Sequence, residues 1–399
     1  VKYILFFIFS LLIGQSEYEF LYRGNIYNGD VRSMGIGNND MIVSSSGLVS
    51  SINPAKLSYI DNSIELNASM ISNMERRSIV ILDSWGEFLA DTDYVFNDHN
   101  YFFGAIGLNY KFDLGYNGSF GFGLTMKPYK SYNYTYEEEV RADRDYPDGY
   151  VGIKDPIIGY QIFKTEGTSY LSSIGFGYST IISNLSDTHP LAIGLGINYI
   201  ENEFFKKSTH IDTLHNTFNS ELLDNFDSIE QTDTIQEIPF STEAVVSMEI
   251  PILKDATLYF SYKTLVNSDS TKNSESIGLK INPNYRTLIA MQYENERDGN
   301  KNINTFNIGF EYFPIKKIPL RAGLEFSEYE YGNISTLTLG TGKKIGNLDL
   351  DIALNYYNIS YYHPNPLSEN FLNFLDCNTG CDKVIENNLS ISTSIKWSF

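Results

Sequence analysis

The chain has 399 residues, of which 42% are apolar and 20% charged, which excludes a disordered chain. No uninterrupted apolar run of about eighteen residues follows the N-terminal stretch, which argues against a membrane-spanning helix. The 29 basic and 49 acidic residues give a net charge of −20, which argues against nucleic acid as a partner.

The chain opens with Lys2 and an apolar stretch from Ile4 to Ile13, followed by Gly14 and Ser16. This pattern is typical of a short signal peptide, and it is too short to cross a bilayer. We therefore expect residues 1–16 to be a signal peptide and the protein to leave the cytoplasm. The alternative, a buried N-terminal helix, fits the pattern less well.

From residue 63 onward, apolar and polar residues alternate with a period of two, as in strands. In residues 102–112 one face carries Phe102, Ile106 and Tyr110, and the other carries Gly107 and Asn109. We expect fourteen strands, at 63–71, 101–112, 119–128, 167–180, 191–200, 240–250, 256–265, 274–282, 285–293, 303–313, 319–328, 333–344, 347–359 and 389–399.

A soluble β-sandwich also alternates, so alternation alone does not decide the fold class. Many of the expected strands reach ten or more residues, as a tilted membrane crossing requires, and short and long connections alternate between them. Aromatic residues, which anchor proteins at membrane interfaces, make up 15% of the chain. These features predict an all-β fold, a transmembrane antiparallel β-barrel of about 14 strands over residues 63–399. Twelve or sixteen strands are the alternatives, since 75–82 also alternates weakly.

The last segment, 389–399, alternates strictly and carries Trp397 and Phe399 on its apolar face. An isolated strand of this kind would be an exposed edge, whereas pairing with the first strand removes that edge. We expect Trp397 and Phe399 to form the C-terminal signal that outer-membrane barrels present to the barrel assembly machinery.

Residues 17–62 precede the barrel and are not clearly stranded. They contain Arg32-Ser33-Met34-Gly35-Ile36-Gly37, then Asn53-Pro54-Ala55 and Leu57. This block resembles the start of the FadL-type outer-membrane family. That family includes long-chain fatty-acid and aromatic-hydrocarbon transporters and relatives that work in type IX protein secretion.

The resemblance implies that residues 17–62 fold into the barrel lumen as an N-terminal hatch. Gly35 and Gly37 would be its close-packed backbone, and Asn53, Pro54 and Ala55 its turn, in keeping with the freedom of glycine and the turn preference of Asn-Pro. The block departs from the family at Lys56, where a small residue is usual, which weakens the inference of a specific hydrophobic ligand. In the family a kink in the third strand opens a lateral gate, and the positions here would be Gly121, Gly123 and Pro128.

Few residues suggest catalysis, and we expect no enzyme activity, no cofactor and no metal site. The five histidines fall in expected loops or turns and do not form a convergent set. Cys377 and Cys381 lie in a C-x3-C loop, where an oxidising compartment favours a small disulfide over two free thiols. Inward charges are expected to contact the hatch or one another: Glu65, Lys111, Lys127, Glu243, Glu249, Lys280, Arg286, Glu311, Arg321, Glu325 and Lys396.

By resemblance, the leading function is passive uptake of hydrophobic small molecules across a Gram-negative outer membrane. Ligand would be captured among loops 72–100, 129–166 and 201–239. The alternative is a type IX secretion-associated barrel that holds cargo or partner subunits. The expected partners are outer-membrane lipid and lipopolysaccharide, the assembly machinery, and either a hydrophobic small molecule or secretion-system proteins. An apolar pocket above the hatch would favour uptake, whereas a polar lumen would favour the interaction role.

Overall fold

The computed structural model describes residues 29–115, 118–131, 133–141, 157–181, 190–201, 203–213, 231–238, 240–266, 272–298, 301–315, 318–329, 332–365 and 381–399. The expected signal peptide, residues 1–16, lies outside these ranges. Within them, no helix is both long and apolar enough to cross a membrane.

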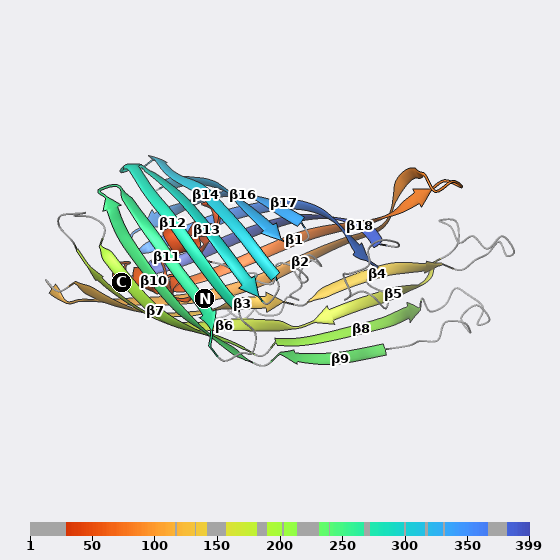
Figure 1. The fold of residues 1–399 in the computed structure, drawn as a ribbon, viewed down its shortest axis with the longest axis horizontal. Helices are drawn as coiled ribbons and strands as arrows, with labels where there is room; N and C mark the ends of the chain where they lie inside the picture. Colours follow the sequence, from red (N-terminus) through yellow and green to blue (C-terminus); the bar gives the residue numbers. More distant parts are fainter. Residues whose placement is uncertain are drawn as a thin grey trace.

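Fourteen antiparallel strands close into a barrel in the order β1-β18-β17-β16-β15-β14-β13-β12-β11-β10-β7-β6-β3-β2 (Figure 1). The barrel strands are β1 (Ser63–Leu82), β2 (Phe88–Asp113), β3 (Ser119–Ser131), β6 (Thr168–Thr180), β7 (Leu191–Ile200), β10 (Ser241–Leu253), β11 (Ala256–Leu265), β12 (Lys272–Asn284), β13 (Thr287–Asp298), β14 (Lys301–Ile315), β15 (Ile318–Tyr329), β16 (Gly332–Ile345), β17 (Leu348–Pro364) and β18 (Cys381–Ser398). Each predicted strand overlaps one of them, so the count of fourteen is confirmed.

Barrel closure is made by the first and last strands. β1 pairs with β18 from Ser63↔Ser398 to Ser78↔Lys383, and the Phe399 N–H donates to the Asn62 carbonyl at 3.0 Å. The expected pairing of the two terminal strands is therefore confirmed. Because the sheet has no free edge, every strand can satisfy its backbone hydrogen bonds within a bilayer.

The outer face of the barrel is apolar. Along β7, Ile193, Leu195 and Ile197 are each more than half exposed, whereas the alternating Ala192 and Asn198 are about 1% exposed and face inward. The same alternation around the closed barrel produces an apolar outer surface. An apolar exterior on a closed barrel of fourteen strands identifies an outer-membrane barrel, with short turns in the periplasm and long loops outside. We call these two ends the turn end and the loop end.

Three of the expected loops contain strands at the loop end. Residues 72–100 are mostly strand, because β1 and β2 continue as a hairpin whose turn is at 83–87. Residues 129–166 contain the end of β3 together with β4 (Tyr134–Arg141) and β5 (Ile157–Glu166), and residues 201–239 contain β8 (Glu203–Thr213) and β9 (Gln231–Ile238). These four form a separate sheet in the order β4-β5-β8-β9. The sequence does not reveal these strands because, beyond the bilayer, outward positions need not be apolar.

Residues 29–62, the described part of the chain ahead of β1, contain four short helices, α1 (Val31–Met34), α2 (Asp40–Val43), η2 (Gly47–Ser51) and η3 (Pro54–Ser58). Nearly all of residues 29–60 are buried, and they contact inward-facing positions of strands around the barrel. We call residues 29–62 the lumenal segment. The barrel wall thus surrounds a folded segment instead of an open pore.

Candidate functional site

The lumenal segment is held together by two buried aspartates. Asp30 caps α1, since its carboxylate accepts a hydrogen bond from the Ser33 N–H at 2.8 Å. Its other oxygen accepts from the Ser45 N–H at 2.7 Å. Ser33 also donates through its hydroxyl to Asp40 at 2.6 Å. These bonds join α1 to α2 and to the turn after it, and they satisfy the helix N-terminus without water.

Gly35 and Gly37 lie where the segment touches the wall most closely. A Cβ on Gly35 would lie 3.0 Å from the Gly340 Cα, and a Cβ on Gly37 would lie 2.5 Å from the Ile308 carbonyl oxygen. Gly37 also has a φ of 71°, a conformation that favours glycine. Its N–H donates to the Thr338 hydroxyl at 2.8 Å. Both predicted positions are therefore points of close backbone contact between the segment and the barrel.

Asn53, Pro54 and Ala55 form the start of η3, and they bind the opposite wall. The Asn53 amide donates to the Met41 carbonyl at 2.9 Å and to Glu249 at 2.7 Å. The Ala55 N–H donates to the Ser247 hydroxyl at 2.9 Å. The Asn-Pro-Ala turn thus joins η3 both to α2 and to strand β10.

Glu249 and Lys56 are buried beside this turn. Glu249 also accepts a hydrogen bond from the Tyr59 hydroxyl at 2.5 Å, so its two oxygens are bound by separate donors from the segment. The Lys56 ammonium donates to the carbonyls of Ile42 and Ser44 at the end of α2. The departure from the family pattern at Lys56 therefore has a structural role, since it satisfies carbonyls that a small residue would leave without a side-chain donor.

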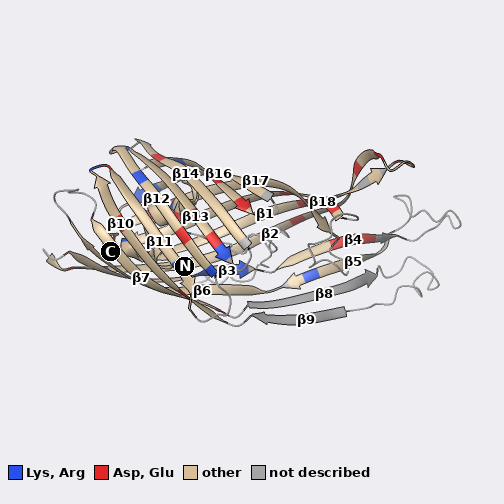
Figure 2. Ribbon diagram, in the orientation of Figure 1, with Lys and Arg blue, Asp and Glu red and all other residues tan. Residues whose placement is uncertain are grey.

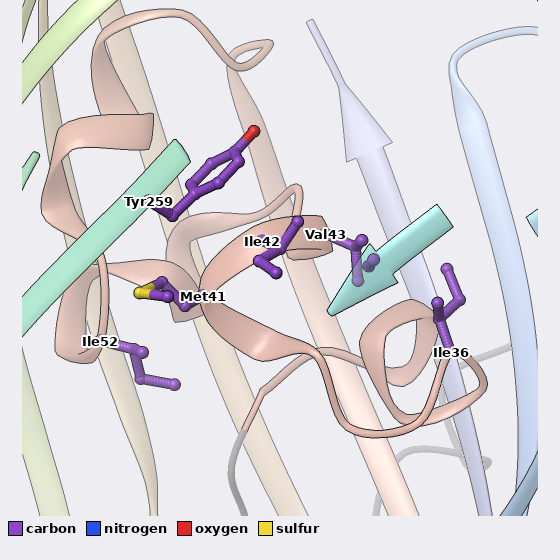
Figure 3. Packing of buried hydrophobic residues seen from close by; sticks show 7 residues of the cluster. Ile36, Met41, Ile42, Val43, Ile52 and Tyr259 are labelled. Atoms are coloured by element: carbon purple, nitrogen blue, oxygen red, sulfur yellow. The ribbon is translucent and has the colours of Figure 1, made fainter. Parts of the chain in front are cut away.

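An apolar cluster fixes α2 against the wall (Figure 3). Its residues are Ile36, Met41, Ile42, Val43, Ile52, Tyr259 and Ala290. All of them are buried, and Tyr259 and Ala290 come from β11 and β13. The segment is thus packed against the wall by apolar contacts as well as by hydrogen bonds.

An ion network connects α1 to β14, β15 and β17. Arg32 binds both oxygens of Glu311, at 3.1 and 2.7 Å. Arg321 donates to Glu311 at 2.7 Å and to Asp351 at 2.5 Å. The expectation that inward charges contact the segment or one another is confirmed for Glu249, Glu311 and Arg321.

A small chamber lies on the loop-end side of the segment, with a volume of about 100 Å³. Its walls carry the following charged residues: Asp40, Lys127, Glu243, Lys263, Lys272, Glu294, Glu296 and Glu325. Lys263 pairs with Glu294 at 3.2 Å, and Lys272 pairs with Glu296 at 2.9 Å. The space directly above the segment is therefore polar, with room for roughly three water molecules.

An apolar cluster lies closer to the loop end, on inward-facing positions of the wall. We call it the mouth cluster, and it consists of Tyr329, Ile334, Tyr357, Ile359, Tyr361 and Val384. Ile303 packs against this cluster and also lines the chamber, as Tyr329 does. The mouth cluster and the polar chamber are therefore continuous, and the upper lumen is apolar on one side and charged on the other.

The predicted lateral-gate residues in β3 are in two different environments. Gly121 and Gly123 pair with β2 and β6, and a Cβ on either would overlap Leu57 of the lumenal segment. The wall is therefore continuous at these two positions. The pairing of β3 with β2 ends at Met126, and its pairing with β6 is irregular between Pro128 and Lys130. Pro128 thus lies where β3 separates from β2.

The sheet formed by β4, β5, β8 and β9 is anchored to the barrel through Arg77 of β1. The guanidinium of Arg77 is fully buried and binds Glu75 at 2.6 Å and Asp382 at 3.2 Å. It lies 5.2 Å from the centre of the Tyr136 ring of β4, and Tyr134 of β4 donates to Glu75 at 2.8 Å. Burial, followed by the neighbouring Tyr94, raises the pKa of Tyr136. The anchor therefore joins the sheet to the wall through charged groups and uncharged tyrosines.

Other predicted sites are placed as follows. Cys381 is disulfide-bonded, and Cys377, the chain's other cysteine, lies outside the described residues. Trp397 and Phe399 are half exposed on the outer face. The expectation that all histidines lie in loops or turns is wrong for three of them. His99 and His363 are in β2 and β17, which continue past the bilayer, and His210 is in β8. Within the described ranges, no group of three or more His, Cys, Asp or Glu side chains could hold a metal ion.

Sequence reasoning missed the mouth cluster, the Arg77 anchor and the role of Lys56. Alternation in 347–359 correctly places Tyr357 and Ile359 on the inner face, yet the inner face was expected to be polar throughout. The inward residues of β17 change from polar to apolar toward the loop end, and this change was the signal in the sequence that could have indicated the mouth cluster.

No family model and no curated protein matches this chain. Solved structures do match it. A FadL homologue from Pseudomonas aeruginosa has a TM-score of 0.57 at 11% identity, over 94% of this chain and 99% of that one. The toluene transporter TodX of Pseudomonas putida has a TM-score of 0.53 at 11% identity, over 93% and 99%. The Ralstonia pickettii toluene transporter TbuX has a TM-score of 0.51 at 12% identity, over 93% and 99%.

These likenesses cover the whole barrel at low identity, so they establish the fold. The chain has the fold of FadL-type channels, as the N-terminal resemblance predicted. None of these three proteins is described as a secretion component, and the alternative of a type IX role gains no support from them.

Proposed function

We propose that this protein is a passive outer-membrane uptake channel for small molecules with a substantial apolar part. The mouth cluster is the observation that carries this proposal, because inward-facing Tyr357, Ile359 and Tyr361 give the lumen an apolar surface near the loop end. Apolar surface of this kind stabilises a hydrophobic molecule that leaves water. The shared fold with the toluene transporters above supports the same function.

The charged chamber next to the mouth cluster narrows the class of molecule. A pure hydrocarbon would have to pass Lys127, Lys263 and Lys272 and their acidic neighbours without satisfying any of them. A molecule with an apolar body and one polar group can contact both surfaces. We therefore favour amphipathic small molecules over pure hydrocarbons as the cargo.

Passage requires the lumenal segment to move, since the chamber of about 100 Å³ is too small for such a molecule. In our proposal the lumenal segment acts as the hatch of the channel. The separation of β3 from β2 beyond Met126 offers a lateral exit, with Pro128 at its edge. In this proposal Gly121 and Gly123 let the hatch pack closely against β3, and they do not form an opening in the wall.

The test is uptake by intact cells that lack their own channels for hydrophobic compounds and express this chain. Radiolabelled toluene and decanoate serve as probes for the two classes. Ile359→Ser replaces a buried residue of the mouth cluster, and Tyr362→Ser, on the outer face of the same strand, is the matched control.

We expect decanoate uptake to exceed that of cells without the chain, to fall in Ile359→Ser, and to be unchanged in Tyr362→Ser. Faster uptake of toluene than of decanoate would reject the amphipathic class and retain the channel. If cells with the chain take up each probe no faster than cells without it, the uptake function is rejected.

A further inference from the structure

A second hollow lies on the turn-end side of the lumenal segment, with a volume of about 690 Å³. It is lined by the ends of strands next to the short turns and by Arg32 and Ser45 of the segment. Tyr285, in the turn between β12 and β13, lies at its edge and is 88% exposed. The hollow is therefore a vestibule that opens to the periplasm, and the uptake function assigns no role to it.

The charge of this vestibule is opposite to that of the whole protein. Five basic side chains on inward-facing positions line it, Arg32, Arg286, Arg321, Lys344 and Lys396, against three acidic ones, Glu311, Asp349 and Asp351. Lys343 also borders the hollow, but it pairs with Leu350 on the outer face of the barrel. The chain as a whole has a net charge of −20. Basic positions are visible at the turn end of the barrel in Figure 2. The positive surplus is thus local and concentrated at one opening.

The acidic residues neutralise only part of this group. Arg32 and Arg321 bind Glu311, whereas Lys344 and Lys396 both lie near Asp349, at 3.7 and 3.3 Å. Among the described residues, Arg286 has no ion-pair partner, and Lys344 and Lys396 share the single carboxylate of Asp349. Arg286 instead stacks on the Tyr285 ring, with 5.2 Å between the guanidinium carbon and the ring centre. This contact holds a planar guanidinium in place with its donors free for a ligand.

We propose that the vestibule is a periplasmic binding site for a small oxyanion, a carboxylate or a phosphate, held by Arg286, Lys344 and Arg32. Guanidinium and ammonium groups are the side chains that bind oxyanions by charge-assisted hydrogen bonds. The side chain of Arg32 is 27% exposed, so a ligand can reach it although it already binds Glu311. The site therefore joins the turns of the barrel to α1 of the lumenal segment.

The packing of the lumen indicates from which side the ligand enters. The lumenal segment is buried against the wall between the chamber and the vestibule, so it blocks a small anion that approaches from the loop end. The vestibule is open on the other side. The anion therefore binds from the periplasm, and this inference goes beyond the uptake function and does not depend on it.

The test is isothermal titration calorimetry of the full chain in detergent micelles, at low ionic strength and in a buffer without phosphate. Sodium phosphate and sodium acetate are the two probes, with sodium chloride added to keep ionic strength constant. The double variant Arg286→Gln/Lys344→Gln removes Arg286, which has no ion-pair partner, and Lys344, which shares its carboxylate with Lys396. Arg297→Gln, which removes an arginine at the loop end, is the control. Heat-dependent mobility of the barrel on electrophoresis confirms that each variant is folded.

We expect the wild-type chain to bind at least one of the two anions, and binding to weaken as salt rises. The double variant should bind about tenfold or more weakly, and Arg297→Gln should bind as the wild type does. The probe that binds with the lower Kd shows whether the site prefers a phosphate or a carboxylate. Equal binding by the folded double variant, or no binding of either anion by the wild type, would overturn the site and leave the uptake function untouched.

Discussion

Arg32 of the lumenal segment and Glu311 of the barrel wall form a bidentate pair, with N–O distances of 3.1 and 2.7 Å. Glu311 is only 2% exposed, and it also accepts a hydrogen bond from Arg321. One carboxylate thus binds two arginines inside the lumen. It is the ion-pair link between α1 and the wall, beside the hydrogen bond from the Gly37 N–H to Thr338.

Replacement of Glu311 by Gln should weaken the attachment of the lumenal segment. Arg32 would then lose its carboxylate partner while Arg321 would keep Asp351, and removing one partner of a buried pair costs about 3–5 kcal/mol. Limited proteolysis followed by mass spectrometry should show faster cleavage within residues 29–62. Asp113→Asn, which removes a partner of Lys111 that is 71% exposed, is the control and should change little. Equal cleavage rates in the two variants would contradict this prediction.

Gly194 allows η3 to contact the wall closely, and the substitution Gly194→Ala should displace η3. A Cβ there would overlap the backbone of Pro54 and Ala55, whereas a Cβ on Gly104 would meet its nearest atom at 3.6 Å. Overpacking of this kind costs about 1–3 kcal/mol. We expect a lower unfolding temperature for Gly194→Ala by circular dichroism, and Gly104→Ala should unfold as the wild type does. The prediction fails if the two alanine variants unfold at the same temperature.

Lys56→Met keeps the length of the side chain and removes its ammonium. The carbonyls of Ile42 and Ser44 would lose their buried donor, at a cost of about 1–3 kcal/mol. Hydrogen exchange followed by mass spectrometry should show lower protection of residues 40–60. Lys254→Met, in an exposed turn, should leave protection unchanged. Unchanged protection in Lys56→Met would show that packing alone holds this part of the segment.

Arg77→Met should release the sheet of β4, β5, β8 and β9 without opening the barrel. The substitution leaves Glu75 and Asp382 buried without their cation, at a cost of about 3–5 kcal/mol. Protease cleavage should become faster within residues 134–166, while the heat-dependent mobility of the barrel stays the same. Arg76→Met is the neighbouring control, because the Arg76–Asp93 pair is about half exposed. Loss of the folded barrel in Arg77→Met would show that the anchor supports the wall itself.

The sequence predicted the strands inside the bilayer and missed those outside it. Lipid requires an apolar residue at every second position. The predicted bounds of β7 and β11 therefore agree with the structure at both ends of each strand. The outer parts of β1 and β2, and all of β4 and β5, lie outside the bilayer, where exposed Asp91 and Asp93 are tolerated on outward positions. Without the lipid constraint the alternation is weak, and these stretches resemble loops.

The candidate site was only partly predictable. The Gly35, Gly37 and Asn53-Pro54-Ala55 positions followed from a resemblance in one short block, and all of them contact the wall. The gate prediction at Gly121 and Gly123 does not describe an opening in this structure, because these glycines accommodate Leu57 of the segment. Glycine in a strand signals a close approach, and the sequence does not say what approaches.

By itself, the sequence determined which side of each membrane strand faces lipid, and with it the closed barrel. That information is local, because neighbouring residues on one strand alternate between two solvents. The tertiary structure alone decided which groups meet across the lumen. Glu249 binds Asn53 from 196 positions away, and Arg32 binds Glu311 from 279 positions away. Such pairs depend on how the closed wall and the segment fit together in space, so the mouth cluster, the chamber and the periplasmic vestibule are properties of the folded barrel.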